Sequence, residues 1–154
     1  MKTVKGRGGT KQVGEWKVLS ETSLADEKRF QRSLTATEQT DIMTKTGLKK
    51  RIWGLLGPKY RFWEGHEIWN EPGAHCQQWH RDYSDTDTNI FPPGLEEEWP
   101  YVCVVPMRGD TSMYVCDRTT CVPKLVVIPH GYCLLFNGLL IHAGADCKNE
   151  RIHY

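Results

Sequence analysis

Two separated histidine motifs contain the residues of this chain that could do chemistry. His80-Arg81-Asp82 lies in the middle of the sequence, and His142 is followed nine positions later by Arg151. Two imidazoles and one carboxylate are the ligands of the non-haem Fe(II) facial triad, which leaves other coordination positions open for substrate chemistry. An arginine just beyond the second histidine suggests that a carboxylate co-substrate binds beside the metal. These residue types therefore predict an oxygenase.

The strands expected around these motifs decide where the side chains point. Residues i and i+2 of an extended strand face the same way, so we expect Gln78, His80 and Asp82 to point inward together. The same alternation aligns Arg151 with His153 on the last strand. A lone His-X-Asp occurs by chance, and a histidine on an apolar strand is often a core residue. The metal site is therefore predicted from the joint pattern of both motifs.

Short apolar runs separated by turn residues follow Gly57-Pro58 and predict an all-β sandwich or barrel. Eight antiparallel strands in two facing sheets form a jelly roll, the double-stranded β-helix, whose mouth suits a metal and a small ligand. Asn137-Gly138 between two apolar runs predicts a type I′ hairpin that sets the register of the His142 strand. The eight expected strands are residues 61–70, 77–83, 101–107, 112–116, 124–128, 132–136, 139–144 and 151–154.

The part of the chain before the strands is predicted to be a tail followed by two short helices. Residues 1–14 are rich in Gly, Lys and Thr and have too little apolar content to pack, so we expect a disordered basic tail. Residues 23–56 have a helical pattern, with Ser23 and Thr37 as the expected N-caps. The helices would support a β core at 60–154, in one domain that spans residues 15–154.

Charge is distributed unevenly along the chain. Residues 1–62 contain 14 Lys or Arg against 6 Asp or Glu, whereas residues 63–154 contain 6 against 13. A nucleic-acid surface is one interpretation of the basic half. The basic residues are dispersed rather than clustered with aromatic residues, which favours a solvated helical face and a basic tail. We therefore expect a small-molecule substrate rather than a nucleic acid.

Neither a signal peptide nor a membrane span is predicted. The N-terminal residues lack the apolar region of a signal peptide, and no stretch approaches the roughly 18 apolar residues of a membrane span. Six cysteines without a paired CxxC motif indicate free thiols in a reducing compartment. Cys116 and Cys121 could instead form a disulfide or bind zinc. The favoured interpretation is a soluble, cytoplasmic protein with no membrane partner, and its oligomeric state is left open.

Two segments of the chain resemble the motifs of a known family. Residues 72–82 read PGAHCQQWHRD, and residues 131–144 read GYCLLFNGLLIHAG and are followed by Asn149-Glu150-Arg151. They resemble the Fe(II)- and 2-oxoglutarate-dependent oxygenases, within them the phytanoyl-CoA dioxygenase-like branch, and the second segment is the more specific. The resemblance covers about residues 60–154. It implies that His80, Asp82 and His142 ligate iron and that Arg151 pairs with the distal carboxylate of 2-oxoglutarate.

The resemblance also implies a reaction. Such an enzyme would consume 2-oxoglutarate and O2, release succinate and CO2, and hydroxylate a small organic substrate. Asp82 favours hydroxylation over halogenation, because related halogenases have a small residue at this place. His153 and Gln78 are expected near the co-substrate, with a structural role for Gln78 as an equal alternative. Arg151 has the alternative of being a surface charge on a terminal strand.

Two other functions are kept as alternatives. One is a non-catalytic jelly-roll or cupin-like domain that binds a metal or a ligand without turnover. The other, less favoured, is a protein or nucleic-acid hydroxylase, which the basic N-terminal half suggests. The N-terminal helical part is short for the family, and the chain ends three residues after Arg151. The expectation is therefore a minimal domain or one truncated at its C-terminus.

Overall fold

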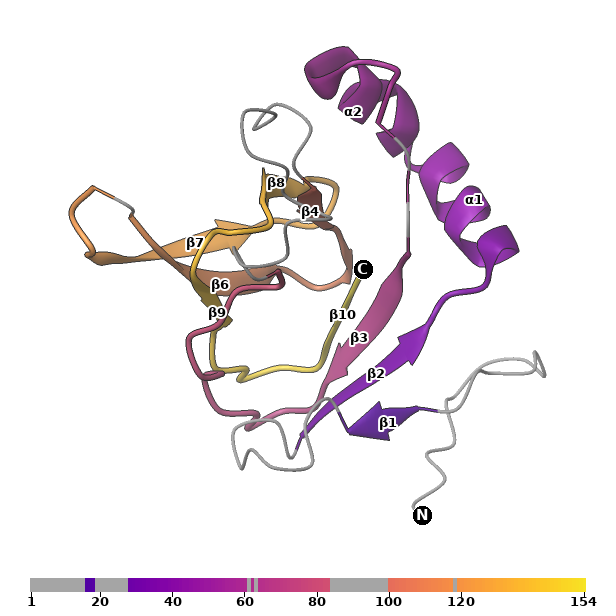
Figure 1. Ribbon diagram of the computed structural model, residues 1–154. Helices are drawn as coiled ribbons and strands as arrows, with labels where there is room; N and C mark the ends of the chain where they lie inside the picture. Colours follow the sequence, from indigo (N-terminus) through magenta and orange to yellow (C-terminus); the bar gives the residue numbers. More distant parts are fainter. Residues whose placement is uncertain (1–15, 19–27, 61, 63, 84–99, 118) are drawn as a thin grey trace.

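The computed structural model describes residues 16–18, 28–60, 62, 64–83, 100–117 and 119–154. Within these ranges the chain is mainly β, with two helices near its start (Figure 1). The predicted basic tail at 1–14, the predicted N-cap Ser23 and the acidic segment 84–99 lie outside the described residues. The elements are β1 (Lys17–Val18), β2 (Arg29–Ser33), α1 (Ala36–Lys45), α2 (Leu48–Leu56), β3 (His66–Asn70), β4 (Tyr101–Val104), β5 (Pro106–Arg108), β6 (Thr111–Cys116), β7 (Pro123–Ile128), β8 (Leu134–Asn137), β9 (His142–Gly144) and β10 (Arg151–His153).

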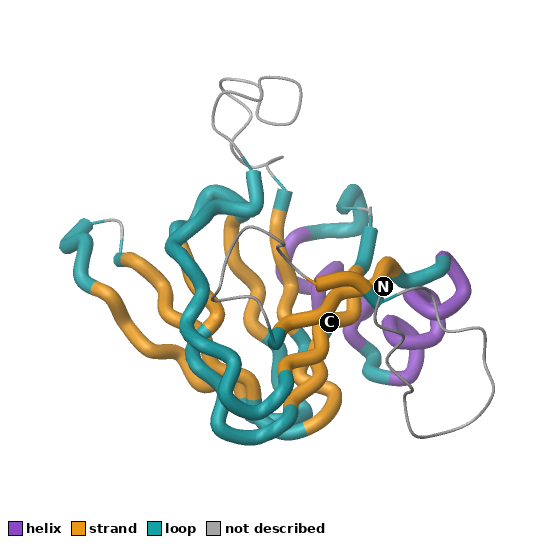
Figure 2. The backbone as a smooth tube through the Cα atoms, turned by 90° about the horizontal axis from the view of Figure 1, so that it is seen from below, coloured by secondary structure: helices purple, strands orange, loops and turns teal. Residues whose placement is uncertain are grey.

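The strands form a double-stranded β-helix, as the sequence predicts. A five-stranded sheet has the order β1-β2-β3-β10-β5, and it faces a three-stranded sheet, β7-β6-β9, and a two-stranded sheet, β4-β8 (Figure 1). Every pairing is antiparallel. The two helices lie together on one side of the strands (Figure 2). This arrangement leaves an interior that is bounded by two sheet faces and by the helices.

The helix α1 begins one turn after β2, and its start is set by a capping box. The Thr35 side chain accepts a hydrogen bond from the Glu38 backbone N–H at 3.2 Å, and the Glu38 carboxylate accepts one from the Thr35 N–H at 2.9 Å. The predicted N-cap Thr37 is therefore wrong by two residues, because Thr35 is the one that has a glutamate three positions later. Gly47, with φ of 63°, then turns the chain into α2.

The helix predicted from residue 23 onward is wrong over Arg29–Ser33, which form the strand β2. This strand pairs with β3 along its whole length, with Arg29 opposite Asn70 and Ser33 opposite His66. Its side chains alternate as a strand requires: Arg29 lies toward the interior, whereas Phe30 packs on the Trp69 ring at a centroid distance of 5.2 Å. Pairing with a segment far along the chain thus overrides the local helical pattern.

The segment 77–83, predicted as a strand, forms only an isolated bridge. His80 and His142 exchange two backbone hydrogen bonds of 2.9 Å, and the Gln77 N–H donates to the Gly144 carbonyl at 2.9 Å. The predicted strand 101–107 is divided at Val105, because β4 pairs with β8 while β5 pairs with β10. At this corner the chain passes from one sheet to the other.

The type I′ hairpin predicted at Asn137-Gly138 is wrong, because β8 and β9 belong to different sheets. The turn itself is present: the Asn137 side-chain oxygen accepts from the Leu139 N–H at 2.9 Å, and its carbonyl accepts from the Leu140 N–H at 2.8 Å. Gly138 has no positive φ. It is required for a close approach instead, since a Cβ there would lie 2.4 Å from the Tyr83 ring. The register of His142 comes from β6, where Val115 lies opposite it.

Two apolar clusters hold these layers together. Met43, Leu48 and Ile52 of the helices pack with Val105, and a second cluster lies between the small sheets. In the described residues no helix has the length and apolar character needed to cross a membrane. All six cysteines are free, so the alternative of a disulfide between Cys116 and Cys121 is not realised.

Candidate functional site

The three predicted metal ligands come together at one point, where His142 is buried, His80 is partly exposed and Asp82 is exposed. His80 and His142 are adjacent through their backbone bridge, and Asp82 follows two residues after His80. Their ligand atoms all lie within 4.8 Å of one another. The Asp82 carboxylate is 3.8 Å from the Nε2 of His80 and 3.6 Å from the Nε2 of His142. The backbone pairing of two distant segments therefore places these side chains.

Both imidazoles are oriented by the same contact. The Nδ1 of His80 lies 2.8 Å from the Gln78 carbonyl, and the Nδ1 of His142 lies 2.9 Å from the Leu140 carbonyl. A carbonyl oxygen can only accept, so the geometry assigns the proton of each neutral ring to Nδ1. Each Nε2 is then left with a lone pair. A backbone hydrogen bond on one ring nitrogen is the usual way to prepare the other nitrogen as a metal ligand.

The donor set fits a divalent metal ion. Two imidazole lone pairs and one carboxylate converge without a hydrogen-bond donor between them, so their negative charge density repels. A cation at their centre would remove this repulsion. Protonation of His142 is the less favourable solution, because burial lowers the pKa of His142 and outweighs the raising effects of the Leu140 carbonyl and Asp82. Two nitrogens and one carboxylate oxygen form the ligand set of the Fe(II) facial triad.

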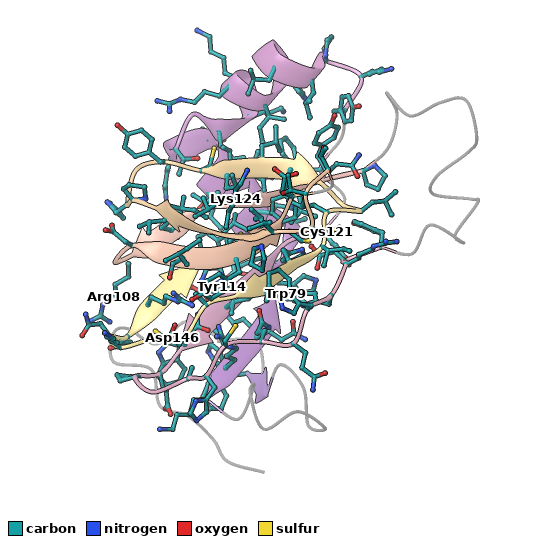
Figure 3. All side chains as sticks on the ribbon, turned by 90° about the vertical axis from the view of Figure 1, so that its left-hand side faces the viewer. Trp79, Arg108, Tyr114, Cys121, Lys124 and Asp146 are labelled. Carbon is teal, nitrogen blue, oxygen red and sulfur yellow. The ribbon has the colours of Figure 1, made fainter. Side chains whose placement is uncertain are left out.

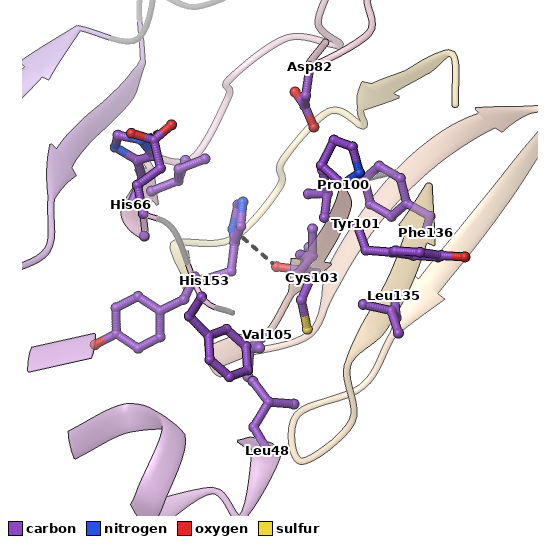
Figure 4. A pocket seen from close by; sticks show the side chains of 18 of the residues that line it. Leu48, His66, Asp82, Pro100, Tyr101, Cys103, Val105, Leu135, Phe136 and His153 are labelled. Atoms are coloured by element: carbon purple, nitrogen blue, oxygen red, sulfur yellow. Dashed lines mark hydrogen bonds and ion pairs between the residues drawn. The ribbon is translucent and has the colours of Figure 1, made fainter. Parts of the chain in front are cut away.

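A cavity of about 1090 Å³ connects this triad with the helices (Figure 4). One end is polar and contains the triad. The other end lies between α1, α2 and the β4–β8 sheet and is lined mainly by apolar side chains. The polar end includes Arg29, Gln77, Thr111, Ser112, Arg151 and His153. The apolar end includes Met43, Leu48, Ile52, Phe62, Val105 and Leu135.

Arg151 lies in the same cavity as the triad and is buried, so the alternative of a surface charge is wrong. Its Nη1 donates to the Ser112 hydroxyl at 3.0 Å and its Nη2 donates to the Ala145 carbonyl at 2.7 Å. Its Nε–H has no hydrogen-bond partner within the part of the chain that the structure describes. Burial lowers the pKa of Arg151, although the guanidinium keeps its charge at any ordinary pH.

His153 lies two residues along β10 and shares the interior face with Arg151. Burial, and then the charges of Arg151 and Arg29, lower the pKa of His153 to about 3. The ring is therefore neutral. Its Nδ1 is 3.4 Å from the Thr111 hydroxyl and 3.5 Å from the Asn70 side-chain nitrogen. His153 is thus placed at the polar end of the cavity, where the alternation of the last strand predicts it.

The predicted inward direction of Gln78 is wrong. Its side chain is exposed and does not line the cavity, whereas the neighbouring Gln77 does. The Gln77 side-chain oxygen accepts from the Gly144 N–H at 2.9 Å. Strict alternation fails here because the segment before His80 is not a regular strand. Trp79 lies outside, where its ring is 6.3 Å from that of Tyr114 on β6 (Figure 3).

Among the polar residues not predicted from the sequence are Arg29 and Ser112 of the cavity wall and the buried Asn70, which Arg29 contacts. Residues 29–33 (RFQRS) alternate in the way that a strand with Arg29 facing inward requires, but the helical pattern predicted over 23–56 hides this alternation. Asn70 ends a predicted strand and Ser112 begins one, so their elements were expected and their direction was not. The side of the sheet to which these side chains point can be assigned only when the strand register is known.

The chain was compared with known proteins. No protein-family model matches the sequence, and no curated protein matches it. Its fold is similar to that in the crystal structure of a prolyl-4-hydroxylase from Pseudomonas putida, with a TM-score of 0.55 and 16% sequence identity. The match covers 81% of this chain and 68% of that chain. At this identity the likeness shows the shared fold.

Proposed function

We propose that this protein is a non-haem Fe(II)- and 2-oxoglutarate-dependent dioxygenase. It would use O2 to hydroxylate a small organic substrate and would release succinate and CO2. One observation carries the proposal: His80, Asp82 and His142 converge in a cavity that also contains the buried Arg151. The shared fold agrees with it, because the similar structure is that of a protein named as a hydroxylase.

Different residues of the chain would bind the metal and the co-substrate. His80, Asp82 and His142 would hold Fe(II), which when bound supplies the redox chemistry of oxygen activation. Arg151 would bind the distal carboxylate of 2-oxoglutarate with a charge-assisted contact, since its Nε–H is unpartnered among the described residues. The neutral His153 would offer its ring at the same end.

The apolar end of the cavity would receive the organic substrate. It is lined by Met43, Leu48 and Ile52 of the helices and by Val105, so it offers mainly apolar contacts. Asp82 would act as a carboxylate ligand where a halogenase would need room for a halide, which favours hydroxylation. The phytanoyl-CoA dioxygenase-like branch and a cytoplasmic location complete the proposal, and both are supported by sequence features alone.

An anaerobic titration with Fe(II) and 2-oxoglutarate tests the site. Chelation of the metal by the keto acid should produce a visible metal-to-ligand charge-transfer band. The band should be lost in His80→Ala and in His142→Ala. It should persist in His130→Ala, which removes an exposed histidine that does not line the cavity. A band that survives in the first two variants would contradict the ligand assignment.

Turnover is tested separately by admitting O2 and measuring succinate. Release of succinate that depends on Fe(II) and 2-oxoglutarate supports the dioxygenase. A chelate band without succinate would instead indicate a jelly-roll domain that binds metal and keto acid without catalysis.

A further inference from the structure

Two cysteine thiols are in contact at one end of the β4–β8 sheet. Cys103 lies on β4, opposite Leu135 on β8. Cys133 comes one residue before β8 and two residues before Leu135. Cross-strand neighbours on the diagonal of an antiparallel pair share a face and lie within reach of each other. In keeping with this register, the side chains of Cys103 and Cys133 are hydrogen-bonded to each other.

The two thiols have different surroundings. Cys103 lines the cavity (Figure 4) and packs against the apolar cluster that the two helices form with Val105. Cys133 is exposed and does not line the cavity. The pair therefore connects the solvent with the wall of the apolar end through one contact between sulfur atoms.

The hydrogen bond between the thiols has a direction. Burial first, and then the charge of a Cys133 thiolate and the hydrogen bond to it, raise the pKa of Cys103 to about 12. A hydrogen bond raises the pKa of a thiol when that thiol is the donor, because the protonated form is then stabilised. Cys103 is thus the donor and the exposed sulfur of Cys133 is the acceptor. A small oxidant in the solvent meets the Cys133 sulfur first, with the protonated Cys103 directly behind it.

Three other thiols have hydrogen bonds of a different kind. Those of Cys76, Cys116 and Cys147 donate to backbone carbonyls, at 3.4, 3.9 and 2.6 Å. A carbonyl oxygen does not become a covalent partner of a thiol under mild oxidation, whereas a second sulfur does. The contact of Cys103 with Cys133 therefore differs in its chemistry from the contacts of these three thiols.

We propose that Cys103 and Cys133 form a modification site that responds to hydroperoxides. The peroxide oxidises the exposed Cys133 thiol to a sulfenic acid and is reduced to water or an alcohol. The Cys103 sulfur then attacks the Cys133 sulfur, an S–S bond forms as the S–OH bond breaks, and the hydroxyl leaves as water with the Cys103 proton. Two thiols and one hydrogen peroxide thus give one disulfide and two water molecules. A dithiol reductant reverses the reaction.

The disulfide acts on the wall of the cavity. A covalent bond brings the two sulfur atoms closer than a hydrogen bond does, so the Cys103 side chain turns toward Cys133 and β4 becomes tied to the start of β8. Because Cys103 packs on the helix cluster, the change falls on the apolar end. This is the end that the proposed function assigns to the organic substrate, although the thiol chemistry itself needs neither the metal nor 2-oxoglutarate.

Treatment of the metal-free full chain with hydrogen peroxide tests the proposal. The remaining thiols are then alkylated, and the peptides are mapped by mass spectrometry. The disulfide between Cys103 and Cys133 should be at least about tenfold more abundant than any other disulfide, because two sulfur atoms in contact have a high effective concentration. Dithiothreitol should restore both thiols. A different disulfide as the main product, or oxidised Cys133 without a bond to Cys103, would overturn the proposal.

Two exposed cysteines provide a matched pair of variants. Cys133→Ser should abolish the disulfide and leave Cys103 reduced, whereas Cys121→Ser removes another exposed thiol and should leave the yield unchanged. In Cys103→Ser the sulfenic acid of Cys133 should persist and be labelled by dimedone, because the thiol that consumes it is absent. Equal dimedone labelling in the wild-type chain and in Cys103→Ser would contradict the proposed second step.

The test keeps its force in two situations. If a variant does not fold, the peptide map of the wild-type chain alone decides whether the two thiols join. If the chelate band or succinate release fails, the thiol chemistry of the metal-free chain is unaffected, so the two proposals stand or fall separately.

Discussion

The two ends of the cavity are built by different forces. At the polar end three side chains are oriented by backbone carbonyls: His80 by that of Gln78, His142 by that of Leu140, and Arg151 by that of Ala145. At the apolar end Ile52 and its neighbours are held by packing alone. Hydrogen bonds have narrow geometry, whereas apolar packing tolerates exchanges of similar volume. The chemistry is therefore fixed at one end, while substrate choice can vary at the other.

The largest effect is expected at the polar end, from removal of the buried Arg151 guanidinium. In Arg151→Ala the affinity for 2-oxoglutarate should fall by about a hundredfold, or on the order of 3 kcal/mol, because a charge-assisted contact in a buried site is lost. Fe(II) binding should be retained. Calorimetric titration of the metal-loaded protein measures this, with Arg108→Ala as the exposed control on the same sheet. An unchanged co-substrate affinity would refute the role of Arg151.

At the apolar end, truncation of a side chain in the helix cluster should lower the stability of the fold and leave metal binding unchanged. Ile52→Ala removes buried methyl groups from the contact with Val105 and should lower the free energy of unfolding by about 2 kcal/mol or more. The metal affinity should change little. Urea denaturation and metal titration of the same variant give both numbers, and Leu55→Ala on the exposed side of α2 is the matched control. A large loss of metal affinity in Ile52→Ala would show that the two ends are coupled.

The ring of His153, which is removed from most solvent, should make the polar end sensitive to acid. Its pKa is about 3 in the folded chain and near 6.5 when unfolded. The unfolded state therefore takes up the proton first as the pH falls, so the contribution is complete above about pH 6.5 and is lost towards pH 3. The loss should approach about 1.4 kcal/mol per pH unit.

Denaturation at pH 6.5 and pH 5.5 tests this expectation. His153→Asn, which cannot titrate in this range, should show a shallower fall in the free energy of unfolding than the wild-type chain. Equal pH slopes for the two proteins would mean that His153 is accessible to protons in the folded state.

The smallest effect is expected from the cap of α1, which touches neither end. Thr35→Ala removes the side chain that receives the Glu38 N–H and should cost about 1 kcal/mol of stability. Metal and carboxylate binding should be unaffected. Thermal unfolding measures the loss, with Thr37→Ala in the first turn as the control. A change in metal or carboxylate binding would show that the start of α1 is coupled to the site.

The sequence allowed the centre of the site to be predicted better than its surroundings. His80, Asp82 and His142 meet as expected, because two specific sequence segments contain them. Arg29 could not be found in this way, because its strand is defined by pairing with neighbours that include β3, which lies far along the chain. The predicted direction of the Gln78 side chain is wrong for a related reason. The backbone before His80 follows the pairing with β9 and does not have the regular pleat of a strand.

The pairing of Arg29 on β2 and Arg151 on β10 with Asn70 on the strand between them also has a kinetic meaning. Its members come from three strands, and Arg29 and Asn70 alone are 41 residues apart in the chain. Contacts of such separation form late, because closing long loops is entropically costly. The pocket around Arg151 therefore depends on closing long loops, since β10 must take its place between β3 and β5. An anion that binds there would select molecules that have completed this step and would draw the folding equilibrium toward them.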